Sequence, residues 1–90
     1  MITRKVLIKG KVQGVWFRAS TKQQAEILSV VGWVRNTEEG DVEGVFQGSK
    51  ENVDKLIQWC HRGPRFAHVT EVIVESDIGN EQFTLFSIRR

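Results

Sequence analysis

The stretch Gly-Lys-Val-Gln-Gly-Val-Trp-Phe-Arg, residues 10–18, joins a segment with the pattern of a strand to a segment with the pattern of a helix. Glycine at positions 10 and 14 permits positive φ angles, which can turn consecutive backbone N–H groups toward one side of a loop. The helix start adds unpaired N–H donors and a partial positive charge, and Arg18 adds a planar cation that matches phosphate or carboxylate oxygens. The stretch therefore suits an anion, although a strand–glycine–helix turn can equally serve only to connect two elements.

The residues on either side of this stretch change their hydrophobic period. Before it, one side of an alternating pattern is mostly apolar and the other mostly cationic, which predicts a strand with one buried face that carries Ile2, Val6, Ile8 and Val12. After it, a helical spacing connects Phe17, Thr21, Ala25, Leu28 and Val31. We expect a helix from about Phe17 to Ser29 or Gly32, and the stripe favours Phe17 as a core residue over a stacking platform for a base.

The middle of the chain predicts a hairpin and a second helix. Residues 33–37 and 42–47 are β-prone and flank a Glu-Glu-Gly-Asp turn. Ser49 is a suitable N-cap for the helix that follows, and Gly63-Pro64 ends it. The residues of this helix that we expect to face the core are Val53, Leu56, Ile57 and Cys60, with Cys60 as a small apolar residue and not a nucleophile.

The last part of the chain completes the fold. Residues 69–76 have strand character, residues 77–80 have the composition of a turn, and residues 83–88 form a final strand. The order β-α-β-β-α-β predicts an α+β protein, a ferredoxin-like two-layer sandwich in which two helices cover one face of an antiparallel sheet. The first strand is expected to be central, so that its end holds residues 10–18 in a rigid position.

Composition restricts the class of protein. The chain of 90 residues fits one domain, residues 1–90, and 40% hydrophobic with 27% charged residues is typical of a globular fold. The net charge of +2 is too small for a general nucleic-acid-binding surface, and no run approaches the ~20 apolar residues of a membrane span. Cys60 is the only cysteine, so no internal disulfide forms, which fits a reducing compartment. Together with the charge and the lack of a membrane span, this predicts a soluble, cytoplasmic monomer that binds neither nucleic acid nor membranes.

Asn36, in the segment Gly-Trp-Val-Arg-Asn at residues 32–36, is the strongest candidate for a second functional residue. A neutral amide is a poor proton acceptor, but its carbonyl oxygen can hold a water molecule. Phosphoryl transfer requires little more once the phosphoryl oxygens are neutralised and the nucleophile is in line. The spacing alone favours the simpler interpretation, in which Asn36 satisfies a backbone group in the hairpin.

Other chemistries have weaker support in the sequence. His61 and His68 lack the carboxylate or cysteine pattern of a metal site, so none is expected. Neither a Walker A motif nor the Gly-x-Gly-x-x-Gly pattern of dinucleotide-binding proteins occurs. Lys9, Lys11 and Arg35 either add a weak positive field around the loop or form a solvated face.

Two motifs together resemble the two signature sequences of the acylphosphatases: Gly10-x-Val12-Gln13-Gly14-Val15-x-Phe17-Arg18, and Gly32-Trp33-Val34-Arg35-Asn36-x-x-x-Gly40-x-Val42 with Gly48. The similarity runs over nearly the whole chain, including Gly63-Pro64 and the closing Phe86-Ser87-Ile88. The resemblance implies a small ferredoxin-like enzyme that hydrolyses acyl phosphates to a carboxylate and inorganic phosphate, without a metal or cofactor.

The same resemblance implies the roles of individual residues. The phosphate would bind the backbone N–H groups of the loop and the Arg18 guanidinium, so the phosphate-binding residues are Gly14, Val15, Trp16, Phe17 and Arg18. Arg18 and Asn36 would be the catalytic residues, with Asn36 positioning the attacking water. Many family members carry glycine where this chain has Ser29, and serine in a left-handed cap would cost on the order of 1 kcal/mol. Trp16 lies at a position that varies in the family, and its bulk is expected to shape the substrate entrance.

Two other function classes remain open on the sequence. Ferredoxin-like domains also bind RNA, but an RNA reader of this fold exposes aromatic residues on its central strands, and the outward face of the first strand has none. A non-catalytic phosphate or carbamoyl-phosphate binding module would use Arg18 and Asn36 equally well. We predict the hydrolase, with an acyl phosphate as substrate and inorganic phosphate as product or inhibitor, because a carboxylate leaving group requires no strong base or nucleophilic side chain.

Overall fold

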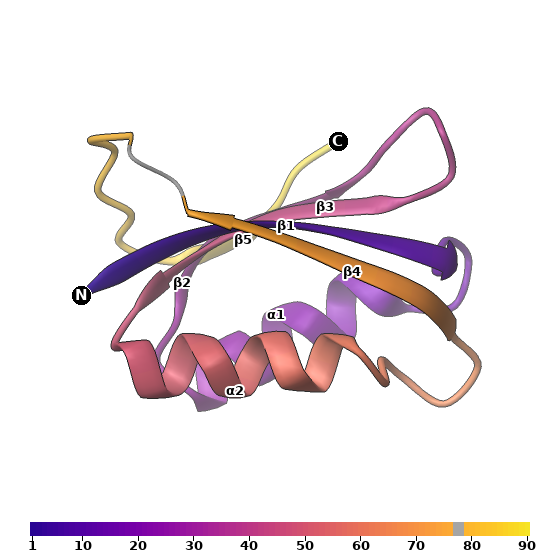
Figure 1. The fold of residues 1–90 in the computed structure, drawn as a ribbon, viewed down its shortest axis with the longest axis horizontal. Helices are drawn as coiled ribbons and strands as arrows, with labels where there is room; N and C mark the ends of the chain where they lie inside the picture. Colours follow the sequence, from indigo (N-terminus) through magenta and orange to yellow (C-terminus); the bar gives the residue numbers. More distant parts are fainter. Residues whose placement is uncertain (77–78) are drawn as a thin grey trace.

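The structure is a computed structural model that describes residues 1–76 and 79–90, and these form two helices and a five-stranded sheet (Figure 1). In chain order, the elements are β1 (Ile2–Lys11), α1 (Phe17–Ile27), β2 (Val31–Asn36), β3 (Val42–Gly48), α2 (Lys50–Cys60), β4 (His68–Ser76) and β5 (Phe86–Ile88). Figure 1 shows both helices on the same face of the sheet. The predicted ferredoxin-like α+β sandwich is therefore confirmed, and β5 is an additional strand that follows the predicted β-α-β-β-α-β order.

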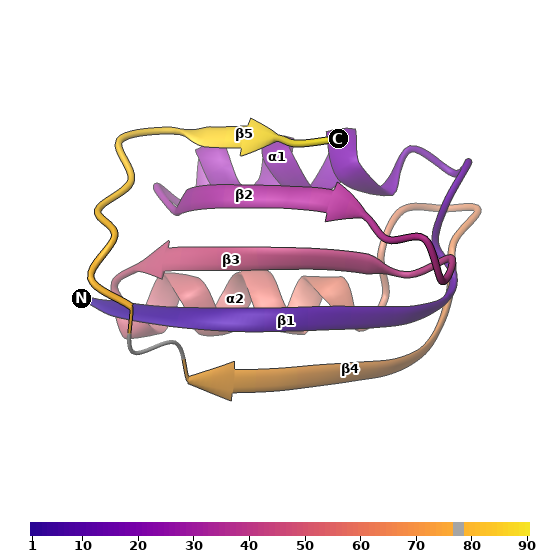
Figure 2. The same ribbon diagram turned by 90° about the horizontal axis from the view of Figure 1, so that it is seen from above.

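The sheet is mixed, and in this respect the prediction of an antiparallel sheet is wrong. The strand order is β4-β1-β3-β2-β5 (Figure 2). β1 is an interior strand, antiparallel to both β3 and β4, but β5 pairs with β2 in parallel. The reason is topological: β4 and β5 occupy opposite edges, so the chain between them crosses the sheet at one end and enters β5 in the direction of β2 (Figure 2).

Several element boundaries differ from the expected ones. α1 ends at Ile27, and Val31 begins β2 instead of continuing the helical stripe. Ser29 adopts φ 57°, the left-handed conformation expected at the end of this helix. The last strand is shorter than predicted, because only Phe86–Ile88 pair with a neighbouring strand. The predicted turn at 77–80 begins with two residues that lie outside the described residues.

The core fills the space between the sheet and the helices, as the periodicities predict. The fully buried apolar residues of β1 are Val6 and Ile8, and those of α2 are Val53, Leu56 and Cys60. Burial raises the pKa of the Cys60 thiol, which keeps it protonated and fits its predicted role as an apolar core residue.

The start of α1 is fixed in this core by Phe17. Its ring is buried and lies 5.6 Å from the ring of Trp59, which confirms Phe17 as a core residue. The buried Thr21 hydroxyl donates a hydrogen bond of 2.7 Å to the Phe17 carbonyl oxygen, so this polar side chain is satisfied inside the core. Gly63 packs against the Phe17 ring at a point where a Cβ atom would collide with it. These contacts fix the point at which α1 begins.

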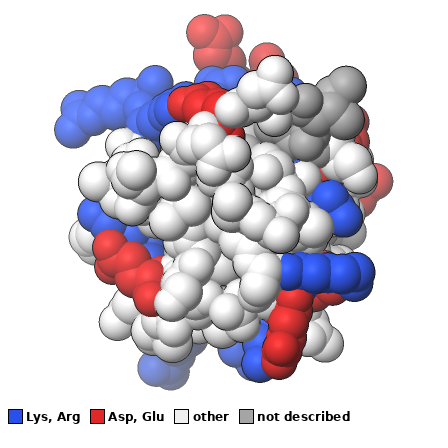
Figure 3. Space-filling model, turned by 90° about the vertical axis from the view of Figure 1, so that its left-hand side faces the viewer, with Lys and Arg blue, Asp and Glu red and all other residues white. Residues whose placement is uncertain are grey.

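The described residues include no helix with the length and apolarity that crossing a membrane requires. Figure 3 shows the end of the molecule away from the β1–α1 loop, where side chains of both charges surround an uncharged centre. Opposite charges alternate on this face, whereas a nucleic-acid-binding face gathers lysine and arginine.

Candidate active site

The β1–α1 loop contains two left-handed residues that are separated by one residue. Gly14 has φ 74° and Trp16 has φ 67°. A Cβ atom on Gly14 would meet no other atom within 4 Å, so the backbone conformation, and not lack of space, requires glycine there. For Trp16 the left-handed conformation is strained, and such strain clusters at functional sites. Left-handed residues among successive N–H groups are typical of backbone nests that bind anions.

The N-terminus of α1 is uncapped. Trp16, the N-cap residue, makes no side-chain hydrogen bond to the helix, and no acidic residue lies in the first turn. The backbone hydrogen bond nearest to this end runs from the Ser20 N–H to the Trp16 carbonyl oxygen, at 3.0 Å. Within residues 1–76 and 79–90, no acceptor takes up the N–H groups of residues 15 to 18. These donors and the positive end of the helix dipole are thus available to an anion.

A cleft of about 710 Å³ opens beside this loop. Its lining comes from the β1–α1 loop, the first turn of α1, the end of β2, and the end of β5 with the chain that follows it. The lining residues are Val12, Gly14, Trp16, Phe17, Arg18, Ala19, Asn36, Ile88 and Arg90. The structure therefore places Arg18 and Asn36, which are 18 positions apart in the sequence, in the same cleft. The Arg18 guanidinium forms no ion pair or hydrogen bond with any described residue, so its charge is available to a ligand.

Asn36 is the last residue of β2, and its Oδ1 is buried without a hydrogen-bond partner among the described residues. An unpaired buried acceptor costs about 1–3 kcal/mol, and native structures seldom tolerate one without a reason. A water molecule or a ligand donor would satisfy this oxygen. In the simpler interpretation, the Asn36 side chain satisfies a backbone group of the hairpin. Among the described residues, the Asn36 side chain makes no such hydrogen bond.

Gln13 connects the β1–α1 loop to the turn that follows Asn36. Its Nε2 donates hydrogen bonds of 2.8 Å to the Thr37 carbonyl oxygen and 2.9 Å to the Asp41 carbonyl oxygen. The Thr37 hydroxyl in turn accepts the Asp41 N–H at 3.0 Å. The sequence motif contains Gln13, but only the structure shows that it joins the two segments from which the candidate site is built.

The remaining predicted residues lie elsewhere. The side chain of Val15 is buried in the core and does not line the cleft, so only its N–H group could contribute to binding. Lys9 pairs with Asp41 at 3.1 Å, and Arg35 pairs with Glu43. These two cations are neutralised by carboxylates and do not line the cleft. Among the described residues, no group of three or more His, Cys, Asp or Glu side chains is arranged to hold a metal ion.

Four residues of the cleft are not among the predicted site residues. Val12 and Ala19 lie close to the predicted phosphate-binding residues in the sequence, whereas Ile88 and Arg90 lie far from them. The latter two reach the cleft because β5 pairs in parallel with β2, with Ile88 opposite Val34. No local motif indicates this pairing, since it depends on which edge of the sheet the last strand occupies.

Comparison with known proteins gives a consistent result. The family model described as Acylphosphatase matches residues 4–88. Curated proteins named acylphosphatase from Geobacter sulfurreducens and Pelotomaculum thermopropionicum are 51% and 49% identical to the chain over 84 and 83 residues. These alignments cover 93% and 92% of the chain, and 92% and 90% of the two relatives. The crystal structure of acylphosphatase from Bacillus subtilis superposes with a TM-score of 0.95 at 29% identity and with full coverage of both chains.

Proposed function

The chain belongs to the acylphosphatase family and is a hydrolase acting on acid anhydrides, and we propose that it hydrolyses acyl phosphates to a carboxylate and inorganic phosphate without a metal ion. The observation that supports this proposal most is the composition of one cleft. It combines unpaired N–H groups and the unpaired Arg18 guanidinium with the unpaired Oδ1 of Asn36. The first set suits a phosphoryl group, and the second suits a water molecule.

The first step is binding of the phosphoryl group. Its oxygens accept hydrogen bonds from the N–H groups of Val15, Trp16, Phe17 and Arg18 and from the Arg18 guanidinium. Each charge-assisted hydrogen bond contributes about 1.5–3 kcal/mol. Because the loop geometry is already fixed by the fold, these donors also stabilise the charge on the equatorial oxygens in the transition state. They supply the charge neutralisation that metal ions supply in many other phosphoryl-transfer enzymes.

The second step is attack by water. The Oδ1 of Asn36 accepts a hydrogen bond from the water and holds it in line with the bond that breaks. The water oxygen forms a bond to phosphorus, and the bond between phosphorus and the acyl oxygen breaks, with its electron pair leaving on the carboxylate. A carboxylate is a weak base and leaves without a proton. Since Asn36 is not a base, we propose that a phosphoryl oxygen accepts the proton of the water.

Benzoyl phosphate, an uncharged aryl acyl group joined to phosphate, tests this proposal. Hydrolysis is followed by the loss of ultraviolet absorbance, with and without excess EDTA. We expect turnover proportional to enzyme concentration, competitive inhibition by inorganic phosphate, and the same rate in EDTA. A rate lost in EDTA and restored by an added divalent cation would contradict the metal-free mechanism. Phosphate binding without turnover would identify a binding module.

We also propose that residues 1–90 act as one acylphosphatase-like domain that works as a cytoplasmic monomer. The loop, Arg18 and Asn36 all come from one chain, so the mechanism needs no second copy. Light scattering should then give the mass of the single chain, 10.3 kDa, under the conditions of the activity assay.

A further inference from the structure

The cleft is larger than a phosphoryl group needs. Its volume of about 710 Å³ lies in the range of sites that enclose a whole small molecule. The proposed phosphate contacts come from residues 15–18, at one part of its lining. Ile88 and Arg90, at the end of the sheet edge formed by β5, belong to the rest of the lining. This part of the cleft is therefore available to the acyl group of the substrate.

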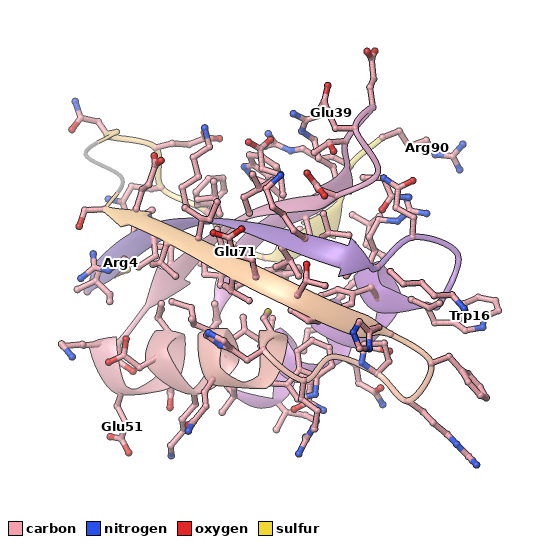
Figure 4. The ribbon with its side chains drawn as sticks, turned by 45° about the vertical axis from the view of Figure 1, so that its right-hand side comes forward. Arg4, Trp16, Glu39, Glu51, Glu71 and Arg90 are labelled. Carbon is pink, nitrogen blue, oxygen red and sulfur yellow. The ribbon has the colours of Figure 1, made fainter. Side chains whose placement is uncertain are left out.

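The side chains of Trp16 and Ile88 give this part of the cleft an apolar wall. Trp16 is 77% exposed and Ile88 is 41% exposed, although residues of these types are usually buried. At the left-handed Trp16, the ring lies outside the core. Figure 4 shows Trp16 and Arg90 projecting from the same end of the molecule. An acyl group attached to the bound phosphate can lie against these apolar surfaces.

The charged side chains that line the cleft are both cationic. They are Arg18 and Arg90, and no Asp or Glu side chain of the described residues lines it. Arg90 forms no ion pair or hydrogen bond with a described residue. Its neighbour Arg89 differs, because it lies over the Trp33 ring at 4.7 Å and 3.9 Å from a carboxylate oxygen of Glu81. Arg90 is thus a free cation beyond the group that binds the phosphate.

We infer that Arg90 is a specificity-determining residue that favours acyl phosphates whose acyl group carries a second negative charge. The acyl group lies against Trp16 and Ile88, and the second anionic group pairs with the Arg90 guanidinium. This inference rests on the proposed hydrolase function and specifies its substrate class. Since Arg90 is exposed to solvent, the preference is modest and falls as salt increases.

The test uses two substrates of nearly the same size, 4-carboxybenzoyl phosphate with a second negative charge and 4-carbamoylbenzoyl phosphate without it. The para carboxylate cannot cyclise onto the anhydride. The two substituents differ in their electron-withdrawing effect, but this difference is the same for every variant and cancels when the variants are compared. The measured quantity is the ratio of kcat/KM for the carboxylate to that for the carboxamide. We expect Arg90→Gln to lower this ratio about fivefold, as an exposed ion pair of up to about 1 kcal/mol implies. High salt should lower the wild-type ratio in the same direction.

Arg89→Gln is the matched control, since it removes the same charge from the adjacent residue outside the cleft and should leave the ratio unchanged. An unchanged ratio in Arg90→Gln, or an equal fall in Arg89→Gln, would overturn the inference. If the wild-type protein hydrolyses both substrates and Arg90→Gln leaves the ratio unchanged, only the inference fails. If it hydrolyses neither, the proposed function fails as well, and the two failures are thus distinguished in one experiment.

Discussion

Arg18 and Asn36 line the same cleft but offer different chemistry, so substitutions at the two positions should separate binding from turnover. Arg18→Ala removes a cation that is unpaired in the described structure, and we expect it to weaken phosphate binding and to abolish measurable turnover. Asn36→Ala removes a neutral acceptor for water, and we expect kcat to fall about 10²–10³-fold, as for other single polar groups that act in the transition state, with phosphate affinity nearly intact.

The measurement for both variants is the affinity for inorganic phosphate together with kcat for benzoyl phosphate. Because both variants lose too much activity for precise inhibition kinetics, calorimetry gives the phosphate affinity directly. If Asn36→Ala weakens phosphate binding as much as it slows turnover, Asn36 is a scaffold residue and another group must position the water. If Arg18→Ala retains both binding and turnover, the loop is not the phosphate site.

For the candidate site, the sequence predicts residue types, and the structure adds their burial and their hydrogen-bond partners. The two motifs name Arg18 and Asn36, but the Asn36 spacing also fits a hairpin residue, and only the buried, unpaired Oδ1 distinguishes the two interpretations. For Ser29, the expectation came from the resemblance, because many family members carry glycine at this position. A left-handed residue often follows a helix end and is usually glycine, and Ser29 adopts this conformation at φ 57°.

At the scale of elements, the candidate site depends on the connection between the β1–α1 loop and the β2–β3 turn through Gln13. Gln13→Glu keeps the shape of the side chain but replaces the donating amide with oxygens that face the Thr37 and Asp41 carbonyl oxygens. We expect unfolding in urea to show a loss of about 1–3 kcal/mol in stability. We also expect kcat to fall about tenfold at temperatures where the variant is fully folded, because the loop and Asn36 are no longer held together.

Gln23→Glu introduces the same charge on the exposed surface of α1 and serves as the control. It should leave both the stability and kcat close to those of the wild type. A Gln13→Glu variant that loses stability but retains the wild-type kcat would show that Gln13 supports the fold and does not position the site.

Periodicity predicts the elements themselves because each helix or strand has one buried face. The alternation before residue 12 and the stripe from Phe17 to Ala25 both correspond to buried side chains. The helical spacing wrongly includes Val31, which is the first residue of β2 and lies at a spacing that also fits the helix. Periodicity therefore predicts which residues are buried more reliably than where one element ends and the next begins.

At the scale of the whole molecule, the position of β5 determines the far part of the cleft, and it could not be predicted from local patterns. Strand pairing depends on contacts between distant residues, and Phe86-Ser87-Ile88 is too short to indicate its partner. The parallel pairing with β2 brings Ile88 and Arg90 to the end of the sheet where Asn36 lies. The proposed phosphate-binding half of the site is thus encoded in one local motif, whereas the proposed acyl-binding half depends on the complete topology.

A buried side chain, Gln47, forms hydrogen bonds with the segment that leads to β5, and Gln47 is 3% exposed. Its Nε2 donates to the Thr3 hydroxyl at 3.1 Å and to the Glu81 carbonyl oxygen at 2.9 Å, and its Oε1 accepts the Phe83 N–H at 3.1 Å. These hydrogen bonds join β3, the start of β1 and the segment that crosses the end of the sheet in Figure 2. Gln47 therefore couples the interior of the sheet to its β5 edge.

Gln47→Met preserves the length of the side chain but leaves three polar partners without hydrogen bonds. We expect the free energy of unfolding to fall by about 2–4 kcal/mol, since each partner loses about 1 kcal/mol or slightly more. The segment before β5 should also become sensitive to proteolysis under native conditions. Without these hydrogen bonds, the free energy of its local opening is lower. Gln58→Met, at an exposed position of α2, is the control and should change neither quantity. Equal stability of the Gln47 and Gln58 variants in urea would show that the connection is held by packing of Phe86 in the core and not by Gln47.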